Sequence, residues 1–292
     1  MPLRSGVRPV VSTVLVLCAV GALAGCTPAT PPARLPAGVT VGILQNRDDY
    51  GPRRLEIAVT NGSTSTLRID SATFLSPSIT GEASDSGAEI PAGSTVDFRV
   101  VLGATICEPE PGTDAVRLAF TDDAGSAGSA DLTPTDPFGA IRNVVAQDCA
   151  EQLTQKTVAI ALADELTTST VAGVLTAHLA VTFTPTGAGA PVRIPSVRRT
   201  ILLRPASGAD TWPVALSFDA ASAPRTVTLD IVPANCRLHT VTEDKRGTYL
   251  PFDTVTSSGA GLFYIGTTVP VKEQVYRYIA AFCGWDASTP LD

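Results

Sequence analysis

The sequence predicts a mainly β fold of two tandem β-sandwich modules, each with a short terminal helix and one disulfide. Three observations support this prediction: segments that alternate apolar and polar residues, an approximate internal repeat, and cysteines at equivalent places in the two halves. Alternation with period two is typical of half-buried strands, and self-similarity over a long period indicates duplicated modules. Residues 39–292 supply enough chain for two modules of ordinary domain size.

The strands are predicted where the alternation is clearest, in segments 54–59, 95–102, 177–183 and 226–232. Dipeptides that favour turns separate such segments, namely Asn61-Gly62, Ser207-Gly208 and Arg246-Gly247.

The two halves repeat the same landmarks in the same order. TVGIL begins at residue 40 and TVAIAL at residue 157, and an alternating segment then leads to Cys107 in the first half and Cys236 in the second. A second cysteine closes each half, at positions 149 and 283. We therefore expect a signal segment at 1–25, a Pro-rich tether at 26–38, the first module at 39–150, the second at 155–285 and a C-terminal tail at 286–292.

A short helix is expected just before the last cysteine of each module. In the first module Asp136 is placed as the N-cap and Pro137 as the first helical residue. Apolar residues then recur at helical spacing in both modules: Ile141, Val144 and Val145 in the first, and Val275, Ile279 and Phe282 in the second.

The repeat predicts the disulfides. Pairing Cys107 with Cys149 and Cys236 with Cys283 keeps each bond inside one module and makes the two bonds equivalent. The competing interpretation is a structural zinc site, which is disfavoured because the chain has no C-x-x-C pair and only two histidines. We expect no metal site and no cofactor.

The N-terminal segment has the form of an export signal. Arg4 and Arg8 precede an uncharged stretch, and small residues close it. As a helix, residues 10–25 would reach about 24 Å, which is short of the roughly 30 Å of a bilayer core. Cleavage after Ala24 by ordinary signal peptidase would release a soluble protein that begins at Gly25.

The alternative rests on Leu23-Ala24-Gly25-Cys26, which resembles the lipobox of bacterial lipoproteins. This resemblance implies that Cys26 receives a diacylglyceryl group, becomes the mature N-terminus and holds the protein on the extracytoplasmic face of the cell membrane. Two acyl chains satisfy the requirement for stable anchoring. Lipidation also accounts for the cysteine that the two disulfides leave over, so we favour it.

The predicted modules loosely resemble immunoglobulin-like sandwiches. The hallmarks of that fold are missing, since no Trp lies between the paired cysteines, and Gln147 and Ala281 stand where its tyrosine is expected. As a whole the chain resembles actinobacterial lipoproteins with tandem β-sandwich domains. That resemblance implies a location and a fold, and no activity.

The charge of the chain limits the classes of partner that it can bind. The net charge of −7 argues against nucleic acid. One locally basic stretch is a candidate contact for an anionic ligand such as a cell-wall polymer or the acidic face of an envelope protein: Arg193, Arg198, Arg199 and Arg204. The simpler interpretation is that these are solvated residues of strand edges.

No catalytic motif is recognisable, so we expect no enzymatic activity. His178 and His239 are interpreted as packing or surface residues, and Trp212 as buried rather than as an exposed anchor. Asp48-Asp49 and Asp122-Asp123 lack the alternating pattern of a calcium loop. The expected role is binding or scaffolding through the sandwich surfaces. The alternatives are a substrate-capturing accessory of a transporter, and a secreted hydrolase with unfamiliar residues.

Overall fold

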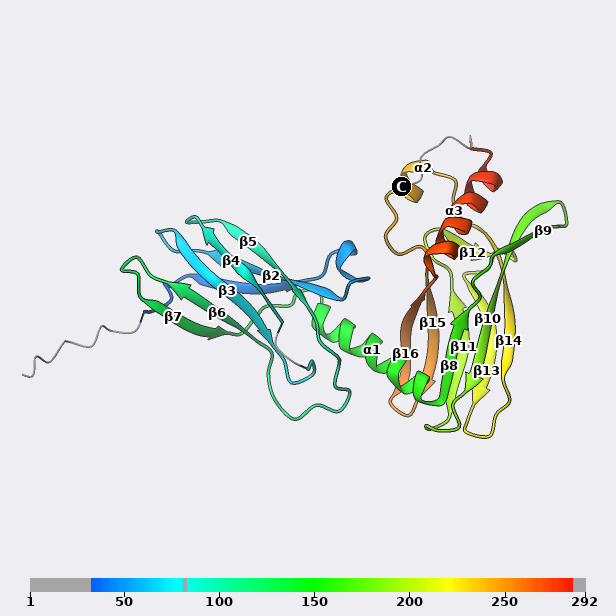
Figure 1. The fold of residues 1–292 in the computed structure, drawn as a ribbon, viewed down its shortest axis with the longest axis horizontal. Helices are drawn as coiled ribbons and strands as arrows, with labels where there is room; N and C mark the ends of the chain where they lie inside the picture. The colour runs from blue at the N-terminus through cyan, green and yellow to red at the C-terminus, as the bar shows by residue number, and fades with distance from the viewer. Residues whose placement is uncertain (1–32, 81–82, 286–292) are drawn as a thin grey trace, which may run out of the picture. The chain divides into compact units, whose positions relative to one another are not determined.

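The computed structural model describes residues 33–80 and 83–285 and confirms the mainly β fold (Figure 1). All the strand ladders that it describes are antiparallel. The signal segment, Cys26, most of the tether and the tail at 286–292 lie outside the described residues. No helix in residues 33–80 and 83–285 is long and apolar enough to cross a membrane.

The first sandwich is built from two sheets around one core. One sheet has the order β1-β2-β5 and the other β4-β3-β6-β7. Side chains such as Ile57, Phe74 and Phe120 alternate inward and are almost fully buried between them. The strands are β1 (Val39–Leu44), β2 (Arg54–Asn61), β3 (Leu67–Leu75), β4 (Ala83–Ile90), β5 (Thr95–Val101), β6 (Ala115–Thr121) and β7 (Ala127–Leu132), with the short helix η1 (Arg47–Asp49) after β1.

The second sandwich likewise consists of two sheets around one core. One sheet has the order β12-β14-β10-β8, with β9 also paired to β10, and the other has the order β13-β11-β15-β16. Its core contains Phe183 stacked on Phe218 and Phe252 stacked on Phe263, with ring centroids 5.6 and 5.7 Å apart. The strands are β8 (Val158–Leu162), β9 (Thr167–Val171), β10 (Val174–Pro185), β11 (Val192–Arg198), β12 (Leu203–Pro205), β13 (Thr211–Phe218), β14 (Arg225–Pro233), β15 (Tyr249–Thr256) and β16 (Gly259–Gly266).

Three of the four predicted strand segments fall inside β2, β10 and β14, and the fourth, 95–102, extends one residue beyond the end of β5. The alternation of apolar and polar residues located these strands because each strand has one face on the core and the other toward solvent. In β10, for example, Leu179, Val181 and Phe183 are fully buried while the residues between them are partly exposed.

The first terminal helix, α1 (Ala140–Thr157), begins later than predicted. Asp136 and Pro137 are not its N-cap and first residue, because Gly139 is the N-cap and has a left-handed backbone with φ of 64°. The Asp136 carboxylate nevertheless accepts hydrogen bonds from the backbone N–H groups of Ala140 at 2.7 Å and Ile141 at 3.0 Å. Although Asp136 lies outside the helix, its carboxylate therefore provides hydrogen-bond acceptors for two backbone N–H groups of the first turn that have no partner within the helix.

The same helix is also longer than predicted, with 18 residues. It does not stop at Cys149 but continues through the expected boundary at 150–155 and leads directly into β8. Ile141 and Val144 pack into the first core, whereas Ala150 packs into the second. Near its end, the hydroxyl oxygens of Thr154 and Thr254 lie 2.8 Å apart in a buried hydrogen bond. One helix thus contributes side chains to both cores.

The other terminal helix, α3 (Val269–Cys283), ends at its cysteine as predicted. Val275 and Ile279 are fully buried in the second core, and Phe282 packs against it. The Tyr278 hydroxyl lies 2.8 Å from the carbonyl oxygen of Ile231 and 3.0 Å from that of Leu175. Burial of this side chain raises the pKa of Tyr278 to about 12. A shorter helix, α2 (Leu238–Thr242), precedes β15.

The described end of the predicted tether is part of the first module. Ala33 and Leu35 pack against its core, and the N–H of Gly62 donates to the carbonyl oxygen of Gly38 at 3.1 Å. Residues 33–38 are therefore attached to the sandwich rather than spacing it from a membrane.

Candidate functional site

Both predicted disulfides are present. Cys107 is bonded to Cys149 and Cys236 to Cys283, with Cα–Cα distances of 5.4 and 5.5 Å. Each bond joins the segment that follows a strand to the helix at the end of the same module. The other two cysteines of the sequence, Cys18 and Cys26, lie outside the described residues.

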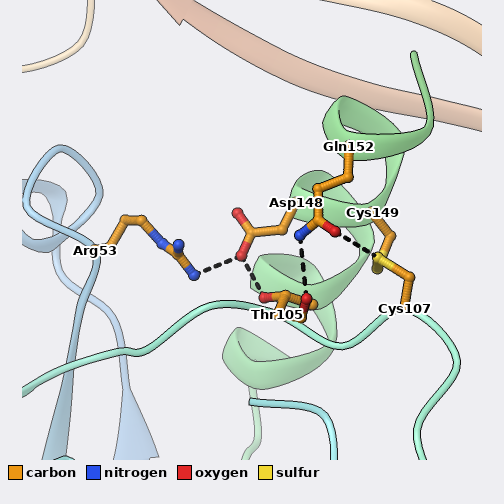
Figure 2. The surroundings of a disulfide bond; sticks show 6 residues. All are labelled: Arg53, Thr105, Cys107, Asp148, Cys149 and Gln152. Atoms are coloured by element: carbon orange, nitrogen blue, oxygen red, sulfur yellow. Dashed lines mark hydrogen bonds and ion pairs between the residues drawn. A yellow bond between two sulfur atoms is a disulfide. The ribbon is translucent and has the colours of Figure 1, made fainter. Parts of the chain in front are cut away.

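A polar cluster surrounds the first disulfide (Figure 2). The Asp148 carboxylate accepts from Arg53 Nη2 at 2.6 Å and from the Thr105 hydroxyl. Gln152 donates from Nε2 to the carbonyl oxygen of Thr105 at 3.1 Å. Its Oε1 also contacts Cys107 Sγ at 3.5 Å, but a disulfide sulfur has no proton to donate. The cluster fastens α1 to the loop after β5.

A cavity of about 210 Å³ lies beside this cluster, lined by α1, the loop after η1 and the residues around β15 and β16. The Arg246 guanidinium lies 3.9 Å from the centroid of the Tyr50 ring and 4.1 Å from that of Tyr264. Glu151, at the cavity wall, has a raised pKa because of burial and the nearby Asp148 carboxylate. The chain's own cation thus occupies the aromatic faces of this cavity.

The four arginines of the basic stretch are not gathered on one strand. Arg193 and Arg198 belong to β11, Arg199 follows it, and Arg204 lies on β12, which is part of the other sheet. Arg198 is paired with Asp253 at 2.7 Å and Arg199 with Asp210 at 2.8 Å. Half of the positive charge of this stretch is therefore already balanced by carboxylates of the chain.

His178 is part of a hydrogen-bonded chain of side chains. Its Nε2 lies 2.7 Å from Ser169 Oγ, and its Nδ1 lies 2.8 Å from Asp230 Oδ1. The three residues come from the adjacent strands β9, β10 and β14. Nucleophile, base and orienting acid in this order are the elements of a serine acyl-transfer site.

The remaining candidates have structural roles. Trp212 is 6% exposed, and its indole N–H donates to the carbonyl oxygen of Asp230 at 2.8 Å, as the prediction of burial requires. His239, in α2, is on the surface and lies 3.1 Å from the carboxylate of Glu243, the C-cap residue of that helix.

The paired aspartates stabilise turns by accepting hydrogen bonds from backbone N–H groups. The Asp122 carboxylate accepts from the N–H groups of Ala124 and Ser126, and that of Asp49 accepts from the N–H of Asn46. In the part of the chain that the structure describes, no three metal-binding side chains gather around one point.

Sequence reasoning missed both the cavity and the Ser169–His178–Asp230 chain. Asp230 is 52 residues from His178, and Ser169 is 9 residues from it, so no linear motif joins them. The signal that was available is the pairing of two alternating segments. A correct register between 177–183 and 226–232 places His178 opposite Asp230.

No family model matches this chain, and no curated protein matches it. Solved structures that match this chain include red sea bream transglutaminase, at 11% identity and a TM-score of 0.22 over 80% of this chain and 32% of that one. Exo-chitosanase CsxA from Amycolatopsis orientalis matches at 16% identity and 0.21 over 78% of this chain and 26% of that one. The chaperone YadV matches at 14% identity and 0.21 over 73% and 92%. This chain therefore spans about a third or less of the first two proteins, and likeness at these TM-scores supports no functional argument.

Proposed function

We propose that this protein is lipid-anchored through Cys26 on the extracytoplasmic face of the cell membrane and binds or scaffolds envelope components through its β-sandwich surfaces. The observation that supports the anchor most strongly is the assignment of the cysteines. Four are held in the two disulfides, so the lipobox cysteine is the one left with a free thiol after removal of the signal segment. An exported protein gains from having that thiol acylated rather than exposed.

The binding role is supported by the surfaces that the fold presents. The cavity beside α1 is smaller than the roughly 300–1,000 Å³ usual for small-molecule sites, and Arg246 covers its aromatic walls. Larger hollows, such as the one of about 640 Å³ beside the start of α1, are open to solvent rather than enclosed. Capture of a substrate for a transporter would need a larger enclosed space. Contacts between the sandwich faces and a macromolecular partner fit the molecule better than enclosure of a small one.

An anionic wall polymer is the partner class for which the basic stretch offers charge. Arg193 and Arg204 would each make such a contact, on the outer faces of the two opposite sheets, since Arg198 and Arg199 are already paired with carboxylates. Such a contact is Coulombic and is screened over about 8 Å at physiological salt. Changing both residues to glutamine should therefore weaken wall binding at low salt, while the Arg117→Gln change, on β6 of the first module, should not.

The experiment that tests the anchor is cell fractionation of the Cys26→Ser variant. Because only the thiol of Cys26 can take the diacylglyceryl group, the variant should appear in the medium or remain unprocessed. The matched control is Cys18→Ser, which changes a cysteine of the signal segment and should leave membrane association intact. A Cys26→Ser protein of normal mature size in the membrane fraction would contradict the proposal, and crosslinking of the anchored protein in intact cells then identifies its neighbours.

A further inference from the structure

A second activity is indicated on the second module. Ser169 Oγ, His178 and Asp230 Oδ1 are joined by contacts of 2.7 and 2.8 Å, both within the range of good hydrogen bonds. We propose that Ser169 is a nucleophile activated by His178 and oriented by Asp230, and that it transfers acyl groups from carboxylic esters. This activity goes beyond the proposed binding role, and its residues lie on the sheet that also contains Arg204.

The sheet holds the three side chains in place. His178 and Asp230 are direct partners in the β10–β14 ladder, so both project from the same face. Ser169 lies two residues from Thr167, the partner of His178 in β9, and therefore projects from that face as well. The β9–β10 hairpin is closed by Ala172 and Gly173, whose φ values of 49° and 82° are typical of a type I′ turn. The turn fixes the register, and with it the place of Ser169.

The hydrogen bonds give each group a role. When the Asp230 carboxylate accepts a hydrogen bond from the Nδ1–H, the lone pair of Nε2 is directed at the Ser169 hydroxyl and can receive its proton. The His178 side chain is only 22% exposed, so its contact with Ser169 is partly shielded from water. The Asp230 side chain is 60% exposed, so solvent weakens its effect on the imidazolium. His178 should therefore matter more than Asp230.

Free backbone donors lie next to the nucleophile. In a two-residue hairpin the flanking residues, Val171 and Val174, form a hydrogen-bonded pair, and such pairs alternate along the ladder. Thr168 and Thr170 therefore belong to non-hydrogen-bonded pairs, and their N–H groups point away from β10. Among the described strands β9 pairs with β10 alone, which leaves these groups at an open edge (Figure 1). The N–H of Thr170, directly after Ser169, is placed to donate to a developing oxyanion.

The reaction follows from these roles. Ser169 Oγ attacks the carbonyl carbon of the ester while His178 Nε2 takes the hydroxyl proton. The ester C–O bond then breaks, and the same proton passes to the departing alkoxide, which leaves as the alcohol. Water then attacks the acyl-serine with His178 again as base, which releases the carboxylic acid and restores the Ser169 hydroxyl.

The test is labelling of the full mature protein, in detergent, with a fluorophosphonate probe. The probe reacts with activated serines with loss of fluoride, and peptide mapping locates the adduct. We expect the label on Ser169. Because general base catalysis contributes roughly 10²–10⁴-fold, His178→Asn should slow labelling by about 100-fold or more. Asp230→Asn should slow it by about 10-fold, since solvent already reduces the effect of this carboxylate.

The matched control is Ser217→Ala, which removes an exposed serine of β13 in the same module and should leave the labelling rate unchanged. Hydrolysis of p-nitrophenyl acetate should follow the same order among the variants, and melting temperatures within a few degrees of the parent confirm that each is folded. Absence of label on Ser169 would overturn the proposal. Equal labelling of the parent and His178→Asn would overturn it too, since the three side chains would then be a cross-strand polar cluster without catalytic effect.

Discussion

The two helices that hold the second cysteine of each module differ in what they do for the fold. In α3 the buried residues Val271, Val275 and Ile279 all belong to the second core, and the helix ends at Cys283. In α1 the cysteine lies in the middle, at position 149. The residues before it pack into the first core and Ala150, directly after it, packs into the second.

The difference shows that an equivalent disulfide can fasten two kinds of helix. Cys236–Cys283 holds the C-terminal end of a helix whose buried side chains all pack into one module. Cys107–Cys149 instead fixes the middle of a helix that serves both, and the Asp148 hydrogen bonds reinforce it there. We therefore expect changes in α3 to be severe and local, and changes in α1 to be milder and to affect both modules.

Removal of a disulfide is expected to lower the free energy of unfolding more than any other change considered. The bonds close loops of 42 and 47 residues, for which chain entropy gives about 4 kcal/mol each. Hydrogen exchange of Cys236→Ala/Cys283→Ala should show lost protection in the second module alone. In the double variant Cys107→Ala/Cys149→Ala, the loss of protection from exchange should extend from the first module along α1 to β8. Identical, module-wide patterns for the two variants would remove the distinction between the helices.

The next effect comes from core packing of the helices. Ile279 of α3 is fully buried, whereas Ile141 of α1 is 8% exposed at the margin of its core. We expect Ile279→Ala to lower the free energy of unfolding by about 4 kcal/mol and Ile141→Ala by about 2 kcal/mol, because the exposed site leaves a smaller cavity. Urea unfolding of the two variants measures both values, and a larger loss for Ile141→Ala would contradict the comparison.

Alkaline pH should act on α3 and not on α1, which has no tyrosine. Tyr278 has a pKa of about 12 in the folded protein, above the ordinary value of 10.0 that it regains on unfolding. The raised pKa means that the folded protein favours the neutral hydroxyl. The contribution of Tyr278 to the free energy of unfolding is therefore complete below pH 10. It decreases by about 1.4 kcal/mol per pH unit as the pH rises toward 12. In Tyr278→Phe this part of the pH dependence of unfolding should disappear. If the slope between pH 10 and 11 is the same in both proteins, Tyr278 does not determine it.

The smallest expected change in the free energy of unfolding comes from the N-terminal caps of the two helices. Asp136 caps two N–H groups of α1, whereas Thr268, the N-cap of α3, makes no side-chain capping bond. Asp136→Ala should therefore cost about 1 kcal/mol, and Thr268→Ala only a few tenths. Thermal unfolding of the pair measures the difference, which should have the opposite sign if Thr268 caps its helix in solution.

Much of the fold was predictable because each module has a clear inside and outside. The alternation in β10 and β14 located both strands, and the repeat of the cysteines gave the correct disulfides. The length of α1 was not predictable in the same way. After Cys149 the sequence AEQLTQKT has no apolar stripe, and it stays helical because Ala150 and Thr154 contact the second module.

The start of α1 was mispredicted for a related reason. Asp136-Pro137 has the chemistry of an N-cap and first turn, but the left-handed Gly139 delays the helix by three residues. The Ser169–His178–Asp230 chain was missed because it depends on the register between β10 and β14, which the sequence pattern alone does not specify for residues as far apart as His178 and Asp230.

The most direct test of the proposed function is mass spectrometry of the N-terminal peptide of the mature protein from membranes. Our account predicts that the chain begins at Cys26 and that this residue has the mass of a diacylglyceryl cysteine, which treatment with a lipase should reduce. A mature chain that begins at Gly25 with an unmodified Cys26 would contradict the account, because cleavage would then have followed Ala24 and released a soluble protein.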